Sequence, residues 1–228
     1  MDQHGSERAT LEMLNSRLRT MLTSRELPLV MAIDGRSGVG KSTLSAAIAR
    51  DLMPTPVTVI EGDTFFMGGS AETWSSRTIA ENADRVIYWR RQRDVLKQLL
   101  RDGVATWLEF DWDAESWDSD IVPLKTQPLS ANAASVVVLE GVYSCRPELQ
   151  DLIDLKVLLT VPEEVRLAQL LEREGDTDQN GWVSRWSAAE DYYFAHIMPE
   201  ESFDLVLSLD RTGHNPADKI FAEDDVDQ

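Results

Sequence analysis

A glycine-rich segment that contains a lysine and two hydroxyl residues is the part of the sequence best suited to binding phosphate. The run GRSGVGKST, residues 35–43, fits the pattern G-x-x-x-x-G-K-[ST] and lies between an apolar segment and a helix-like one. Glycines let the chain turn so that successive backbone N–H groups face phosphate oxygens, and the following helix adds its positive N-terminal end. Lys41 would reach the terminal phosphates of a nucleotide, and Ser42 would bind Mg²⁺. The expected nucleotide-binding residues of this segment are Gly35, Ser37, Gly38, Val39, Gly40, Lys41, Ser42 and Thr43. An ordinary glycine-rich turn with a surface lysine is the alternative.

Two carboxylates follow other apolar segments. Asp63 comes after residues 57–60, and Glu140 comes directly after residues 136–139. The carboxyl ends of parallel strands meet at the ligand-binding edge of a sheet, so both side chains are expected near the phosphates. Glu140 could bind the metal or orient its water ligands, and Asp63 could accept the proton of a hydroxyl that attacks the γ-phosphate. The alternatives are a solvent-facing strand end for Glu140 and a helix N-cap for Asp63.

The elements that must position these side chains alternate between strand and helix patterns. Short apolar segments predict five buried strands. They lie at residues 29–33, 57–60, 136–139, 155–161 and 205–209. Helical patterns cover residues 8–23, 41–52 and 85–101. The alternation predicts an α/β fold: a P-loop NTPase three-layer sandwich with a mainly parallel five-stranded sheet, in one domain over residues 1–228. Residues 64–135 are too many for a simple crossover and are expected to form an acceptor-binding insertion.

Composition and charge exclude several classes of protein. The 40 acidic residues outnumber the 22 basic ones, and the resulting net charge of −18 disfavours a nucleic acid partner. No run approaches the roughly 18 apolar residues of a membrane span, so no membrane partner is expected. The single cysteine, Cys145, excludes an intramolecular disulfide framework and a four-cysteine zinc site. The first residues do not resemble a secretory signal, so a cytoplasmic location is expected.

The ordered set of motifs resembles the uridine kinase and phosphoribulokinase family of P-loop kinases. The segments are AIDGRSGVGKST, GDTFF, EFDWD, VVVLEGVY and VRLAQLLERE, and the resemblance covers roughly residues 28–210. It implies a uridine kinase-like ATP:alcohol phosphotransferase that uses ATP and Mg²⁺ and phosphorylates a hydroxyl of a small molecule. It also implies a lid over about residues 163–186 and a homodimer.

The resemblance implies roles for particular residues. Asp63 takes the position of the acceptor-hydroxyl base, Ser42 and Glu140 are associated with the metal, and Lys41 and Arg173 complete the catalytic set. The lid arginines that would close on the ATP phosphates are Arg166, Arg173 and Arg185. The acceptor would contact Asp63, Phe66, Tyr88, Phe110, Asp111, Trp112 and Tyr143. A solvated helix face, with the arginines paired to neighbouring glutamates, is the alternative for the lid.

Three departures from the family pattern disfavour uridine as the acceptor. The lid helix carries Gln169 and Leu170 where basic residues are dense in family nucleoside kinases. Tyr88-Trp89 stands where a ribose-binding Asp is expected, and Phe110 lacks the hydroxyl of the tyrosine frequent there. A nucleoside, a sugar or its phosphate, a pantothenate-like alcohol and a specialised metabolite all remain open as acceptors. The competing class is an NTPase or nucleotide-binding switch with no small-molecule acceptor, which would need neither Asp63 nor the aromatic insertion.

Overall fold

A parallel sheet forms the centre of the molecule. The computed structural model describes residues 7–25, 28–114, 122–174 and 182–208. The strands of the sheet are β1 (Glu7–Ala9), β2 (Leu29–Asp34), β3 (Val57–Glu61), β6 (Val136–Glu140), β7 (Leu155–Thr160) and β8 (Leu205–Ser208). Their spatial order is β1-β8-β7-β2-β6-β3, and every pair that the structure describes is parallel. The five predicted strands are confirmed, and residue 209 of the last one lies outside the described residues.

The sixth strand, β1, was not predicted. The helical pattern was expected to begin at residue 8, which is wrong: α1 spans Leu11–Leu22, and the residues before it pair with β8. The Thr10 side chain caps α1 by accepting a hydrogen bond from the Met13 backbone N–H at 3.2 Å. A capping side chain of this kind satisfies an N–H that has no partner within the helix, and it therefore sets the point where the helix begins.

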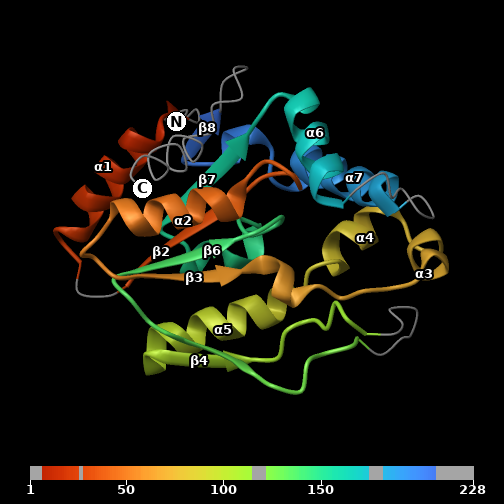
Figure 1. Ribbon diagram of the computed structural model, residues 1–228, viewed down its shortest axis with the longest axis horizontal. Coiled ribbons are helices and arrows are strands. Elements are labelled where there is room, and N and C mark those ends of the chain that lie inside the picture. Colours follow the sequence, from red (N-terminus) through yellow and green to blue (C-terminus); the bar gives the residue numbers. More distant parts are fainter. Residues whose placement is uncertain (1–6, 26–27, 115–121, 175–181, 209–228) are drawn as a thin grey trace, which may run out of the picture.

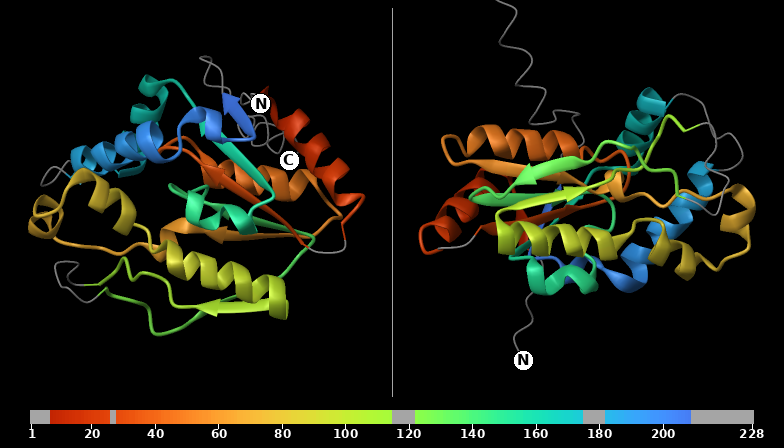
Figure 2. Two further views of the ribbon diagram at one scale, coloured as in Figure 1. Left: turned by 180° about the vertical axis from the view of Figure 1, so that it is seen from behind. Right: turned by 90° about the horizontal axis from the view of Figure 1, so that it is seen from below.

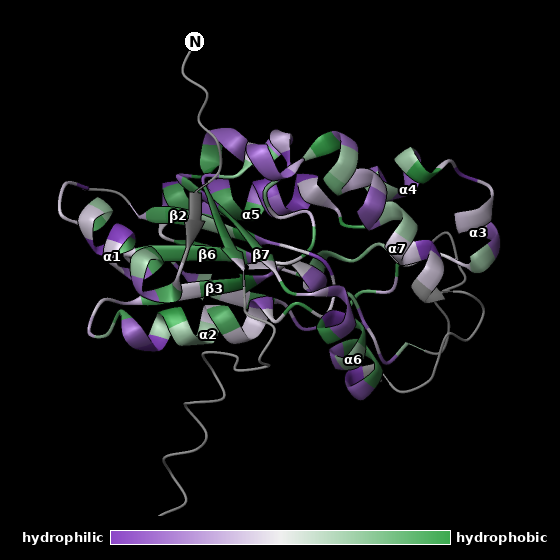
Figure 3. Ribbon diagram, turned by 90° about the horizontal axis from the view of Figure 1, so that it is seen from above, coloured by the Kyte–Doolittle hydropathy of each residue, from purple (hydrophilic) through white to green (hydrophobic). Residues whose placement is uncertain are grey.

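Helices cover both faces of the sheet (Figure 1; Figure 2). All six residues of β2 are buried, and alternate side chains enter two separate hydrophobic clusters. Met31 and Ile33 pack with residues of α1 and α2 (Lys41–Asp51), whereas Val30 and Ala32 pack on the side of α5 (Trp89–Asp102). Strands buried on both faces read as continuous apolar runs, which is how the sequence revealed them. Figure 3 shows these apolar strands between helices whose outer faces are polar.

The long segment between β3 and β6, predicted to be an insertion, contains several helices and a two-stranded sheet, and its helix α5 packs on one face of the main sheet. It contains the 3₁₀ helix η1 (Gly62–Phe65), α3 (Ala71–Ser75), α4 (Ile79–Arg85), α5, and the antiparallel strands β4 (Val104–Trp107) and β5 (Leu129–Asn132). The helix expected over residues 85–101 corresponds to α5. Phe65 stacks on Trp107 with ring centroids 5.9 Å apart, which ties the insertion to the end of β3.

The described residues of the predicted lid form α6 (Glu163–Glu174) and the start of α7 (Trp182–Tyr192). A π-helix, η4 (Tyr193–Ile197), continues α7, and the short 3₁₀ helices η2 (Pro147–Leu152) and η5 (Glu200–Ser202) complete the connections of the sheet. Residues 175–181, in the middle of the predicted lid, lie outside the described residues. Among the helices that the structure describes, none has the length and apolarity needed to cross a bilayer.

Candidate active site

The glycine-rich segment forms a loop that encloses the ammonium group of Lys41. Lys41 is the first residue of α2, and its Nζ donates hydrogen bonds to the carbonyl oxygens of Gly35 at 3.0 Å and Arg36 at 3.1 Å. Gly38 has a φ of 85°, and a Cβ there would lie 2.6 Å from the Leu170 side chain of α6. A side chain at this position would therefore be strained and would also separate the loop from the lid helix.

Ser42 and Glu140 lie together at the mouth of the loop. The Ser42 hydroxyl donates to Glu140 Oε1 at 2.8 Å. Glu140 is 5% exposed, and burial raises the pKa of its carboxyl, although the Lys41 charge and the Ser42 hydrogen bond act in the opposite direction. The register of β6 with β3 pairs Glu140 with Glu61, so Asp63, two residues later, lies at the same edge of the sheet.

These oxygen groups fit Mg²⁺. The described residues include no cluster of three or more His, Cys, Asp or Glu side chains that could hold a metal without other ligands. Mg²⁺ usually keeps several waters and is bound through one or two protein oxygens together with substrate phosphates. A neighbouring hydroxyl and carboxylate beside a phosphate-binding loop therefore match Mg²⁺ bound with a nucleotide better than a metal bound by the protein alone.

A cavity of about 320 Å³ joins the predicted catalytic residues. It is lined by Ser37, Gly38, Gly40, Lys41, Ser42, Thr43, Asp63, Glu140, Val142, Gln169 and Arg173. Asp63 comes from η1, Glu140 from the end of β6 and Arg173 from α6, so three separate elements converge on the loop. The structure thus brings together Lys41, Ser42, Asp63, Glu140 and Arg173, as their types and positions in the sequence had suggested.

The predicted acceptor-binding aromatics form a second group beside Asp63. Phe66, Phe110 and Trp112 contact one another, with centroids 4.8 Å apart for Phe66–Phe110 and Phe110–Trp112, and 5.0 Å for the stacked pair Phe66–Trp112. Phe66 and Phe110 are buried, whereas Trp112 is 43% exposed. The group therefore presents one accessible ring at its outer side.

The other predicted acceptor residues have different surroundings. Asp111 Oδ1 accepts the Asp113 backbone N–H at 3.2 Å, within the turn that carries Trp112. Tyr88 is the N-cap residue of α5, and the Arg91 guanidinium lies 5.3 Å from the centre of its ring. Tyr143 is fully buried. Contact of these residues with an acceptor stays a prediction.

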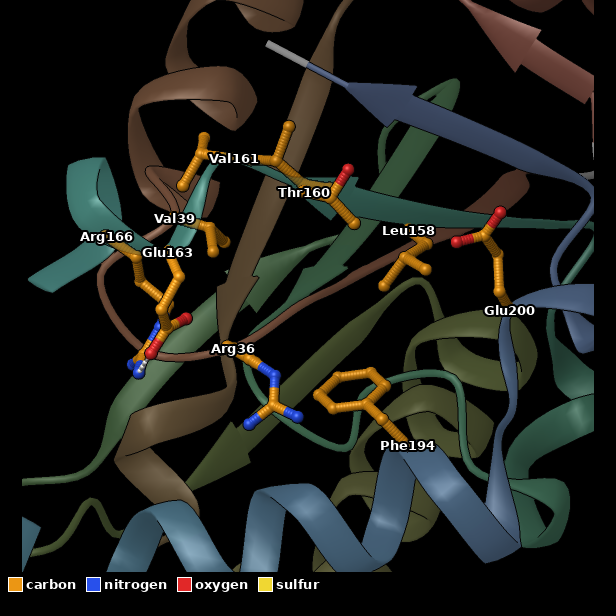
Figure 4. A pocket seen from close by; sticks show the side chains of 10 residues that line it. Arg36, Val39, Leu158, Thr160, Val161, Glu163, Arg166, Phe194 and Glu200 are labelled. Atoms are coloured by element: carbon orange, nitrogen blue, oxygen red, sulfur yellow. Dashed lines mark hydrogen bonds and ion pairs between the residues drawn. The ribbon is translucent and has the colours of Figure 1, made fainter. Parts of the chain in front are cut away.

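Arg166 lies apart from the other predicted lid residues. It lines a second cavity of about 320 Å³, together with Arg36, Glu163 and Phe194 (Figure 4). Its guanidinium donates to both carboxylate oxygens of Glu163, at 2.8 and 2.6 Å, and to the Ser37 carbonyl at 3.2 Å. Arg166 is 4% exposed, so these contacts attach the beginning of the lid helix to the phosphate-binding loop. Arg185 is half-buried on α7, and for both arginines contact with ATP stays a prediction.

Sequence reasoning missed Asp34, whose carboxylate binds the backbone at the start of the phosphate-binding loop and in the segment after β6. This fully buried carboxylate accepts the backbone N–H groups of Gly35 at 2.8 Å, Tyr143 at 2.9 Å and Cys145 at 3.0 Å, and the Tyr193 hydroxyl at 2.8 Å. Burial raises the pKa of Asp34, and the hydrogen bonds oppose that shift. The sequence did contain one signal that could have identified this residue: Asp34 is the only charged residue of the strand β2 and stands at its end.

Sequence reasoning also missed Glu190 and Trp186 on α7. Glu190 Oε1 accepts hydrogen bonds from the Ser37 backbone N–H at 2.8 Å, from the Ser37 hydroxyl at 2.7 Å and from the Trp186 indole N–H at 2.6 Å. Ser37 is therefore held by α6 through Arg166 and by α7 through Glu190. Because Glu190 is one of two adjacent acids on its helix, no pattern in the sequence distinguished it.

The comparisons with known proteins agree with this geometry. A family model described as the Phosphoribulokinase / Uridine kinase family matches residues 30–203. The uridine kinase of Leuconostoc citreum (strain KM20) is 26% identical over 177 residues, which cover 75% of this chain and 79% of that protein. The structure of a possible uridine kinase from Bacillus stearothermophilus aligns with a TM-score of 0.61 at 19% identity, over 85% of this chain and 98% of the other. A D-glycerate 3-kinase from Cryptococcus neoformans var. grubii aligns with a TM-score of 0.61 at 12% identity, over 88% and 96%.

These structural neighbours share the fold, but their names give different acceptors, so the fold alone does not identify the acceptor of this protein. The family model covers most of the chain, from β2 to the residues just before β8, and includes every residue that lines the Lys41 cavity. The chain therefore belongs to the phosphoribulokinase and uridine kinase family of P-loop kinases.

Proposed function

We propose that this protein transfers the γ-phosphoryl group of ATP to a hydroxyl of a small molecule, with Asp63 as the base. The observation that carries the proposal is the convergence of Lys41, Ser42, Glu140, Asp63 and Arg173 on one cavity. Phosphoryl transfer requires mainly positioning and charge stabilisation, and these residues supply cations, metal-binding oxygens and a carboxylate.

Asp63 has the position that a base for the acceptor needs. It is exposed on η1, three residues before Phe66, and it lines the cavity that contains Lys41. A hydroxyl bound against Phe66 and Trp112 would be directed toward Asp63, which would accept its proton as the new P–O bond forms.

Lys41 and Arg173 would both act on the phosphates, Lys41 from the phosphate-binding loop and Arg173 from α6. The Lys41 ammonium now bonds to loop carbonyls and would turn to phosphate oxygens, while Arg173 would approach from the lid helix α6. Both cations would reduce the negative charge on the transferring group, a large contribution in this reaction. Ser42 and Glu140 would hold Mg²⁺, which supplies further charge neutralisation across the terminal phosphates.

An NTPase or a nucleotide-binding switch is the competing function, because a phosphate-binding loop alone does not require an acceptor. Two observations favour the kinase. Asp63 lines the cavity although it is not needed to bind phosphate, and Phe66, three residues later, belongs to an aromatic group with Phe110 and Trp112.

The test is an acceptor panel. ATP consumption should be measured with nucleosides, sugars, sugar phosphates and pantothenate-like alcohols, and the product should be identified by mass. We expect one class to stimulate ADP formation and to gain a phosphoryl group, and we expect Lys41→Ala to abolish both effects because the phosphates lose their main cation. ADP formation at one rate whatever the acceptor would instead indicate an NTPase.

The Ser42–Glu140 pair gives a prediction about the metal. Glu140→Gln should raise the Mg²⁺ concentration for half-maximal activity by about 10- to 100-fold, because the amide keeps the hydrogen-bonding shape but loses the charge that holds the metal and its waters. A Mg²⁺ titration at saturating ATP measures this shift. Glu61→Gln, an exposed carboxylate paired in register with Glu140, is the matched control and should shift the midpoint little. Equal shifts in the two variants would contradict the assignment.

A further inference from the structure

Two buried polar atoms beside the phosphate-binding loop are unpaired. Glu190 Oε2 and the Tyr143 hydroxyl oxygen have no hydrogen-bond partner among the residues that the structure describes, and both side chains are 0% exposed. A buried polar group without a partner costs about 1–3 kcal/mol, so such groups are rare in native proteins and each one requires an explanation.

The two groups belong to one cluster. Trp186 connects them: its indole N–H lies 2.6 Å from Glu190 Oε1, and its ring centroid lies 6.4 Å from that of Tyr143. The Glu190 charge contributes to a raised Tyr143 pKa, second to burial, which agrees with their proximity. Ser37 and Trp186 both donate their hydrogen bonds to the same oxygen of Glu190, Oε1. The second oxygen, Oε2, therefore makes no hydrogen bond that holds the loop.

The backbone of Tyr143 is also in an unfavourable conformation. Its φ is 69°, and it is the one non-glycine residue with a positive φ in the part of the chain that the structure describes. Bulky residues adopt this region at a cost of about 1–3 kcal/mol, and such strain persists where the surrounding structure fixes the residue for a purpose. The hydrogen bond from the Tyr143 N–H to Asp34 supplies that fixation, three residues after Glu140.

The cluster adjoins the proposed acceptor site. The Trp186 ring lies 5.9 Å from Phe66 between centroids, and Phe66 in turn contacts Phe110 and Trp112. Trp186 thus contacts both Phe66 and the Glu190–Tyr143 cluster, so this cluster borders the aromatic group that would bind the acceptor.

We propose that Glu190 Oε2 and the Tyr143 hydroxyl bind a hydrogen-bond donor of the acceptor remote from the hydroxyl that is phosphorylated. This inference rests on the proposed function and narrows its substrate class. A carboxylate can only accept, so the complementary group is a hydroxyl, an amide N–H or an amine. A phosphate or carboxylate at this end of the acceptor would face a buried negative charge and be rejected. The acceptor is thus a neutral polyol or an amino alcohol rather than a phosphorylated sugar or a nucleotide.

Two conservative variants distinguish binding of the acceptor by Glu190 and Tyr143 from support of the phosphate-binding loop by Glu190. Glu190→Gln retains an amide oxygen for Ser37 and Trp186 and places an NH₂ group where Oε2 was, so a donor on the acceptor meets another donor. Tyr143→Phe removes only the unpaired hydroxyl, so its unfolding midpoint should not fall. Glu201→Gln, an exposed acid, and Tyr192→Phe, a half-buried neighbour, are the matched controls.

The experiment compares matched compounds that differ in one ionised group: nucleosides with their monophosphates, sugars with sugar phosphates, and amino alcohols with hydroxy acids. We expect the neutral or cationic member of the accepted pair to have the higher kcat/KM. Both variants should raise the acceptor KM by roughly tenfold or more, with the ATP KM within about twofold of the wild type, because the lost contact is made only to the acceptor.

Three results would overturn the inference. Equal use of an anionic counterpart, or an unchanged acceptor KM in both variants, would overturn it while the kinase function stands. Equal increases in the ATP and acceptor KM values of Glu190→Gln would mean that this residue only supports the loop, which also overturns it. If no compound is phosphorylated, the proposed function fails and the inference fails with it.

Discussion

Replacement of Asp63 by Asn is expected to lower kcat for acceptor phosphorylation by about 10²–10⁴-fold, the usual contribution of a positioned general base. Asn has the same size and can still hydrogen-bond the acceptor, but it cannot take the proton that leaves the attacking hydroxyl. Among the residues that the structure describes, none of the phosphate-binding loop forms a hydrogen bond or ion pair with Asp63, so the ATP KM should change little. Steady-state kinetics with the acceptor that the panel identifies would measure both parameters.

The matched control for Asp63→Asn is Asp111→Asn, a half-buried acid in the turn before Trp112 whose carboxylate is engaged by the Asp113 N–H. Its effect on kcat should be much smaller, because no proton transfer is assigned to it. If Asp63→Asn left kcat unchanged and ADP formation continued without an acceptor, Asp63 would not be the base, and the NTPase or switch would be the better function.

Replacement of Asp34 by Ala is expected to lower the free energy of unfolding by about 3 kcal/mol or more. Four donors, three of them backbone N–H groups, would lose their shared acceptor inside the protein, and each buried donor left unpaired costs about 1–3 kcal/mol. Urea unfolding, followed by circular dichroism, measures the change. Asp102→Ala, whose carboxylate pairs with Arg101 at the surface, is the control and should cost far less.

The pH dependence of stability gives a second readout for Asp34. Because burial raises its pKa above the ordinary value of 3.8, the folded protein keeps the proton at pH values where the unfolded chain has released it. The contribution of this carboxyl to the unfolding free energy is therefore fully present below about pH 3.8, and is lost as the pH rises to the folded pKa. The difference in unfolding free energy between the wild type and Asp34→Asn should fall over that window. A difference that rises with pH would contradict the raised pKa.

Much of the fold could be predicted because its signals are local. Most strands of the sheet are buried on both faces and therefore appear as short apolar runs, so β2, β6, β7 and β8 were found. The strand β3 lies at the edge of the sheet and is only partly buried, but it carries a similar run and was also found. The strand β1 was missed because three residues, including Glu7 and Arg8, carry no such run, and only pairing with β8 makes them a strand.

The residues of the candidate site also divide into those that local sequence signals identified and those that only the structure placed. Lys41 and Ser42 are recognisable because the loop that positions them is encoded within nine consecutive residues, and Asp63 and Glu140 are recognisable because each follows a strand whose carboxyl end must lie at the ligand-binding edge. Helical spacing put Arg166 and Arg173 on one face of the predicted lid helix, and the family resemblance implied their roles. In the structure Arg173 lines the Lys41 cavity, whereas Arg166 pairs with Glu163 and Ser37, and the spacing did not indicate this difference.

The sequence by itself determined the phosphate-binding loop, the buried strands and the acids at the ends of two of them, since backbone conformation and burial patterns depend on neighbouring residues. Only the tertiary structure decided which buried carboxylates organise the site. Asp34 binds donors 109 to 159 residues away, and Glu190 binds Ser37 across 153 residues. Such contacts form only after parallel strands and the lid helices have been brought to one edge, and their energies depend on the burial that this packing creates.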